Sequence, residues 1–222
     1  MRGLATAIAA IFIAGGAAAS SVTVQNAGFE EPELGTNGFS MDNGNTPEWS
    51  VFGDDELGGA YRFIGSTYTS GLPSGDQVGY LAAGVSMYQA LGITVAAETD
   101  YTLSAWIGDR STTTFAGGFA GFAVGTGPSF TQTFLTAVAD PGDSRGTVQS
   151  FTTTAAELQP HVGADLYVLL TTEGNSDGAI QTTYDDIAVT ATGPSVVPLP
   201  AAVWMLLGAV GALTAISARR SA

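Results

Sequence analysis

The chain has 222 residues, no cysteine, a single histidine and a formal net charge of −14. These counts exclude disulfide bonds, thiol catalysis, cysteine-ligated zinc and multi-histidine metal sites. The acidic surplus also argues against nucleic acid as a partner, because phosphates require cationic patches. An acidic surface of this kind either keeps an exported protein soluble or recruits calcium through oxygen ligands.

The first 19 residues are typical of a secretory signal peptide. Arg2 supplies a positive charge, Leu4–Ala14 is an apolar stretch, and Ala17 and Ala19 place small side chains at the positions that signal peptidase requires. We therefore predict export and cleavage after Ala19. An uncleaved membrane anchor is the alternative.

Residues 20–192 are expected to form one domain, which is long enough for a full hydrophobic core. Its segments alternate apolar and polar side chains with a period of two, as half-buried strands do. The predicted strands are Ser21–Gln25, Ala60–Gly65, Gln77–Ala82, Ser86–Leu91, Tyr101–Ile107, Gly118–Gly125, Thr131–Ala137, Thr147–Thr153, Asp165–Thr171 and Thr183–Thr190. A single helical piece is predicted at Ala155–Leu158, before Pro160. This pattern predicts an all-β fold, a two-sheet jelly-roll sandwich.

After a short linker at residues 193–196, the chain ends in a segment with three parts. A proline-containing motif comes first, an apolar stretch at residues 201–218 follows, and two arginines stand near the end. The motif and the arginines are Val197, Pro198, Leu199, Pro200, Ala201, Arg219 and Arg220. The apolar stretch predicts one transmembrane helix with a positive cytoplasmic end.

This tail resembles the PEP-CTERM sorting signals of Gram-negative bacteria, in the variant written VPLPA. The resemblance implies a protein of the cell envelope or cell surface, held in the membrane at least transiently. It also implies an exosortase-type membrane protease as a partner, which cuts near the motif. An ordinary C-terminal anchor is the alternative.

The body resembles the galactose-binding-like jelly rolls found in carbohydrate-binding modules. The resemblance rests on the order of short motifs: Asn26–Glu30, Trp49, Gly75–Leu81, Tyr101–Ser104 and Tyr184–Val189. It implies a structural calcium ion that ties the first strand to the last.

The positions that match the calcium ligands of that family are Glu30, Asp185 and, less closely, Asp76, with Asp54 as a competitor. Oxygen ligands of this kind suit Ca²⁺. In the alternative interpretation, Glu30 only caps the first turn by hydrogen bonds.

Aromatic side chains could stack on sugar rings because they offer flat apolar area. Trp49 and Trp106 are more simply explained as packed residues, so we expect any sugar platform to use Tyr61 or Tyr68, on a loop or an exposed face.

No catalytic motif is recognisable. Adjacent acidic residues such as Asp185 and Asp186 point to opposite faces of a strand. The sequence also has no Gly-x-Ser-x-Gly motif that would supply a serine nucleophile for His161. We therefore predict a non-enzymatic surface or matrix protein associated with extracellular polysaccharide. The alternatives are a carbohydrate-binding module with a defined glycan ligand and, third, a polysaccharide-acting hydrolase with an unrecognised site.

Overall fold

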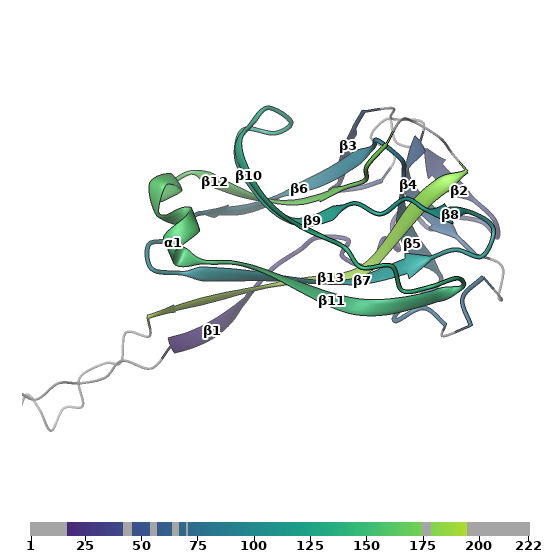
Figure 1. The fold of residues 1–222 in the computed structure, drawn as a ribbon, viewed down its shortest axis with the longest axis horizontal. Helices are drawn as coiled ribbons and strands as arrows, with labels where there is room; N and C mark the ends of the chain where they lie inside the picture. Colours follow the sequence, from purple (N-terminus) through teal and green to yellow (C-terminus); the bar gives the residue numbers. More distant parts are fainter. Residues whose placement is uncertain are drawn as a thin grey trace, which may run out of the picture. The chain divides into compact units, whose positions relative to one another are not determined.

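The period-two alternation produces β-strands over most of the chain, and the strands form two sheets that pack face to face (Figure 1). The computed structural model describes residues 17–41, 46–53, 57–63, 67–69, 71–174 and 179–194. Within them, residues Ala19–Gly193 form one compact unit. The predicted all-β, two-sheet sandwich is confirmed.

The larger sheet has eight strands among the described residues, in the order β11-β7-β13-β5-β4-β2, with β1 and β8 also paired to β13. The strands are β1 (Ala17–Val22), β2 (Phe39–Met41), β4 (Gly58–Arg62), β5 (Gln77–Ala82), β7 (Asp100–Asp109), β8 (Thr114–Phe115), β11 (Arg145–Thr153) and β13 (Ile180–Pro194). The strand β13 therefore lies at the centre of this sheet, between β5 and β7.

The smaller sheet has the order β10-β9-β12-β6-β3. Its strands are β3 (Ser50–Phe52), β6 (Ser86–Thr94), β9 (Phe119–Gly125), β10 (Phe130–Ala137) and β12 (Asp165–Thr171). Side chains from both inner faces meet in one core, in which Leu103, Phe122 and Tyr184 are at most 1% exposed.

A bulge interrupts the pairing of β13 with β7 between Asp185 and Ala188. At the bulge the backbone of Asp186 has a φ of +50°. The extra residue shifts the alternation of side chains along β13, so a different set faces the core after the bulge. Tyr184 points into the core before the bulge, and Ile187 does so after it. As a result Asp185 is buried and Asp186 is exposed.

The helix α1 (Ala155–Leu158) connects β11 to β12 and covers one end of the sandwich (Figure 1). The helix begins and ends at the residues that the sequence predicted. A capping box of Thr154 and Glu157 starts it, Leu158 inserts into the core, and the 3₁₀ turn η2 (Gln159–His161) follows.

Three short strands were missed, β2, β3 and β8, because two or three residues are too few to show a period of two. The first strand was predicted at Ser21–Gln25 but runs from Ala17 to Val22. It ends early because residues 25–28 form a turn, with Asn26 at a φ of +45°.

No helix among the described residues is long and apolar enough to cross a membrane. The transmembrane helix and the sorting motif predicted for the C-terminal tail lie outside the described residues, as does most of the predicted signal peptide.

Candidate active site

A second hydrophobic cluster lies on the outer face of the larger sheet, opposite the core. Alternation along β7 turns Leu103, Ala105 and Ile107 inward, so Trp106 faces outward. Trp106 is nevertheless only 5% exposed, because Tyr68 packs on it from outside the sheet. Tyr68 belongs to the segment of residues 67–69 and 71–76, which we call the pocket roof because most of the pocket described next is lined by it.

A pocket of about 180 Å³ opens among the residues of this roof and Phe63, which follows β4. Its lining residues are Phe63, Thr67, Tyr68, Gly71, Leu72, Gly75 and Asp76. The ring of Tyr68 stands edge-on to Phe63 at 5.1 Å and to Trp106 at 5.0 Å, so aromatic rings line one side of the pocket.

Hydrogen bonds fix the hydroxyl of Tyr68. Its oxygen lies 2.5 Å from Oγ1 of Thr183, and that Thr183 hydroxyl donates to the carbonyl of Gly108 at 2.8 Å. Since the proton of Thr183 is used on Gly108, the proton of Tyr68 points to Thr183. Burial raises the pKa of Tyr68, which keeps the phenol neutral.

Tyr61, on β4 beside the cluster, is surrounded by other side chains. Phe39 stacks on its ring at 4.1 Å, Phe63 meets it edge-on at 4.4 Å, and the guanidinium of Arg110 lies over it at 5.1 Å. Tyr68 is only 7% exposed. The exposed platform expected at these tyrosines therefore does not include Tyr68, which is buried except where it lines the pocket.

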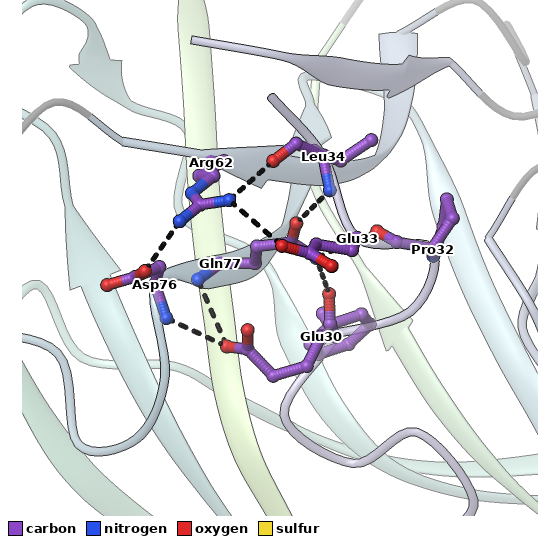
Figure 2. A network of polar contacts seen from close by, with 8 residues as sticks. Glu30, Pro32, Glu33, Leu34, Arg62, Asp76 and Gln77 are labelled. Atoms are coloured by element: carbon purple, nitrogen blue, oxygen red, sulfur yellow. Dashed lines mark hydrogen bonds and ion pairs between the residues drawn. The ribbon is translucent and has the colours of Figure 1, made fainter. Parts of the chain in front are cut away.

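A polar network beside the pocket holds the segment after β1 against β4 and β5 (Figure 2). Glu30 Oε1 accepts hydrogen bonds from the backbone amides of Asp76 and Gln77, at 3.1 and 3.0 Å. The carboxylate of Asp76 instead binds Arg62 at 2.8 Å, and Arg62 also donates to the carbonyl of Leu34 at 2.7 Å.

The three predicted calcium ligands are therefore not brought together as a set. Asp76 does not fit the role, because its carboxylate is paired with Arg62. Among the described residues there is no group of three or more His, Asp or Glu side chains that could hold a metal.

Glu30 and Asp185 do fit a cation. Asp185 is fully buried, and its Oδ2 has no hydrogen-bond partner in the described part of the chain. Burial raises the pKa of Asp185 to about 8, with the charges of Asp186 and Glu30 adding to the shift. A divalent cation bound by two carboxylates and by backbone carbonyls would remove this repulsion.

A second aromatic group lies on the outer face of the smaller sheet. Phe52, Tyr88, Phe130 and Tyr167 meet edge-on, with ring centroids 5.3 to 6.3 Å apart, and each is half-buried. Sequence reasoning missed this patch, because its strands are neighbours only in the sheet.

The HpiC1-like family model, described as HpiC1 cyclase, matches residues 20–190. The Stig cyclase Fisc from Fischerella sp. TAU, in complex with (3Z)-3-(1-methyl-2-pyrrolidinylidene)-3H-indole, has a TM-score of 0.64 at 19% identity, over 80% of this chain and 100% of that chain.

Two further solved structures are similar. A Fischerella sp. TAU cyclase in complex with 4-(1H-indol-3-yl)butan-2-one has a TM-score of 0.63 at 19% identity, over 80% of this chain and 100% of that chain. The module TmCBM61, in complex with β-1,4-galactotriose, has a TM-score of 0.48 at 15% identity, over 75% and 95% of the two chains. A comparison of this chain with curated proteins found no match.

The prediction of a non-enzymatic protein is therefore wrong. The matching family model and the solved structures with the higher TM-scores are cyclases, so an enzyme is indicated. Two of the pocket residues, Tyr68 and Asp76, were expected from the sequence, but as a sugar platform and a calcium ligand. The sequence does not show that they line one pocket together with Phe63.

Proposed function

The chain belongs to the HpiC1-like family of cyclases, and on that premise we propose that it closes a ring in an apolar, aromatic substrate bound beneath the pocket roof. The observation that carries the proposal is the aromatic pocket with its fixed Tyr68 hydroxyl. The indole ligands of the Fischerella cyclases support an indole-like ring as the group that enters it.

The size of the pocket limits what it can enclose. A volume of about 180 Å³ lies below the roughly 300–1,000 Å³ that usually surround a drug-sized ligand. The pocket therefore holds one ring system, and the rest of the substrate extends over the neighbouring surface.

The aromatic walls contribute by excluding water and by stabilising positive charge. Ring closure by attack of an alkene or aromatic ring on an electrophile passes through a cationic species. The π faces of Tyr68 and Phe63 attract such a cation, and the effect is larger where water is excluded.

Tyr68 acts as a hydrogen-bond acceptor in this proposal. Its own proton is directed to Thr183, so its remaining lone pair is available to an N–H group such as that of indole. Asp76 is the carboxylate among the lining residues. Its ion pair with Arg62 holds it in the charged form, in which it can accept the proton that a cyclised cation loses when its aromatic ring is restored.

The test uses 4-(1H-indol-3-yl)butan-2-one as a probe and titration calorimetry as the measurement. We expect the parent protein to bind it, and Tyr68→Phe to weaken binding about fivefold, the value of one hydrogen bond near 1 kcal/mol. Tyr88→Phe, on the other sheet, is the matched control. Unchanged affinity in Tyr68→Phe, or an equal loss in the control, would contradict the assignment.

A second candidate function is sugar binding by an exported, polysaccharide-associated protein with a galactose-binding-like jelly roll. The half-buried rings of Phe52, Tyr88, Phe130 and Tyr167 favour it, since aromatic faces suit pyranose rings. Titration with β-1,4-galactotriose tests it: binding that Tyr88→Ala removes supports this function, and no binding at millimolar sugar contradicts it for this glycan.

A further inference from the structure

A second pocket lies between the two sheets, apart from the aromatic cluster. Its walls come from β1, β7 and β13 of the larger sheet and from β6 of the smaller one, and its volume is about 470 Å³. Among the described residues, none lines both this pocket and the one beneath the roof. Its volume lies within the roughly 300–1,000 Å³ that usually surround a drug-sized ligand, so the pocket can enclose a whole small molecule.

In the described part of the chain, the pocket opens where two strand edges have no partner strand. β12 pairs with β6 from Ser86 to Thr94, but β3 covers the other edge of β6 only from Ser86 to Tyr88. In the larger sheet, β1 pairs with β13 and with no other described strand. The sandwich is therefore open between β1 and the second half of β6, and side chains of both strands line a space there.

Hydrogen bonds fix β6 before and after the residues that line the pocket. The side-chain amide of Gln89 accepts from the backbone amide of Gln25 and donates to the Gln25 carbonyl, both at 2.8 Å, which ties the chain after β1 to β6. Just after β6, the amide of Val95 donates to the Ala164 carbonyl, and the amide of Gly163 donates to the Val95 carbonyl, both at 2.9 Å. These bonds need no ligand, so the pocket is preformed.

The walls of the pocket are aliphatic, and its rim is polar. The aliphatic side chains come from the strands and from the turn after β6: Val22, Leu91, Ile93, Ala96 and Ala191. Exposed serine and threonine side chains, Ser21 and Thr94 among them, surround these walls. The described lining residues carry no charge. An ion would lose its hydration here without gaining a charged partner, so the pocket favours a neutral ligand.

One polar group of the lining is buried, the hydroxyl of Tyr101. This residue is 2% exposed, and its ring stands edge-on to Phe122 at 6.1 Å. The hydroxyl oxygen accepts a hydrogen bond from the backbone amide of Ala96 at 3.1 Å, and Ala96 also lines the pocket. The hydroxyl proton is not used in this bond, so it can be donated to an oxygen atom of a ligand in the pocket.

We propose that this pocket binds a neutral aliphatic carbonyl compound, such as a medium-chain ketone or ester. The alkyl chain lies against Leu91, Ile93 and Ala191, and the carbonyl oxygen accepts the proton of Tyr101. The site differs in chemistry from the pocket proposed for ring closure: aromatic rings attract a cation there, whereas aliphatic side chains bind by burial of apolar area here. The lining residues of β1 begin at Ser20, so the predicted cleavage after Ala19 leaves them in place.

Titration of the full chain with 2-nonanone, followed by NMR of the backbone amides, tests the proposal without a cyclase substrate. We expect saturable shifts at millimolar ketone, centred on Thr94 and Ala96. Tyr101→Phe should weaken the affinity about fivefold, the effect of one lost hydrogen bond. The amide of Ala96 stays satisfied in this variant, because Ala96 is exposed and water can reach it.

Two further variants make the result specific. Ala191→Leu should remove binding, because the larger side chain takes the space of the ligand while the hydroxyl of Tyr101 is kept. Tyr167→Phe is the matched control: it deletes a tyrosine hydroxyl in the aromatic group on the outer face of the smaller sheet and should leave the affinity unchanged.

The proposal is overturned by the absence of saturable shifts in the parent, by unchanged affinity in either Tyr101→Phe or Ala191→Leu, or by an equal loss in Tyr167→Phe. Shifts centred on Phe63 and Tyr68 would also overturn it, since they would place the ketone in the aromatic pocket. Binding of the indole probe is measured separately, so failure at this site is distinct from failure of the proposed function.

Discussion

At the scale of single residues, the buried carboxyl of Asp185 destabilises the larger sheet when it is charged and unpaired. A buried carboxylate with an unpartnered oxygen is strongly unfavourable, and either a proton or a cation must offset it. The nearby carboxylate of Glu30 favours the cation, since a proton on Asp185 would neutralise only one of the two groups.

We therefore predict that calcium binds at Glu30 and Asp185 and that EDTA lowers the melting temperature. A metal that binds only the folded state stabilises it by about 2.7 kcal/mol at a hundredfold excess over Kd. Differential scanning calorimetry should show this shift in the parent and in Asp186→Asn, the exposed neighbour, but not in Asp185→Asn. An unchanged melting curve of the parent would remove the metal from this site.

Asp185 should also make the stability of the domain depend on pH when EDTA is present. The folded pKa of Asp185, about 8, lies above its ordinary value, so its contribution to stability is full below about pH 4 and is lost as the pH rises to about 8. Calcium favours the charged form and should remove this decline.

At the scale of secondary-structure elements, α1 is the part of the fold whose local sequence explains it best. The Thr154 hydroxyl accepts from the Glu157 amide, and the Glu157 carboxylate accepts from the Thr154 amide at 2.8 Å. The Thr154 hydroxyl also donates to the Glu157 carboxylate at 2.7 Å, and this bond, together with the one from the Thr154 amide, lowers the pKa of Glu157. The cap places Leu158 in the core at the point where the chain passes from β11 to β12.

Thr154→Ala should lower the free energy of unfolding by about 1 kcal/mol, the typical value of an N-cap. Urea denaturation at pH 7 measures it, with Thr126→Ala, in an exposed turn, as the control. Because the folded pKa of Glu157 is lowered, its share of the cap is present at neutral pH and is lost in acid. A loss of stability that does not shrink in acid would contradict this account of the cap.

At the scale of the whole molecule, we predict that the two ends of the chain determine where the domain is located. The apolar stretch at residues 201–218 would span about 27 Å as a helix, close to the hydrocarbon thickness of roughly 30 Å. Arg219 and Arg220 would stay on the cytoplasmic side, which puts the sandwich outside.

We predict that the tail is lost in cells that carry an exosortase-type protease and is kept in a host that lacks one. We expect the prolines of the motif to keep residues 197–201 out of a helix, and an extended segment is accessible to a protease. Intact-mass measurement of the protein from both hosts is the test. Equal masses, both including Ala222, would leave an ordinary anchor.

The sequence by itself determined the local structure of the chain. The strands at Gln77–Ala82 and Asp165–Thr171 and the helix at Ala155–Leu158 have the predicted ends. Periodicity and capping depend on residues a few positions apart, so they can be recognised in the sequence alone. The two-sheet class follows from the number of strands.

The tertiary structure alone decided the site. Tyr68 and Thr183 are 115 positions apart and share a hydrogen bond because β13 pairs between β5 and β7. The pairing of β4 with β5, which sets Arg62 opposite Gln77, brings Asp76 to Arg62. Strand order depends on how the core packs over the whole domain, and no short segment of the chain contains that information.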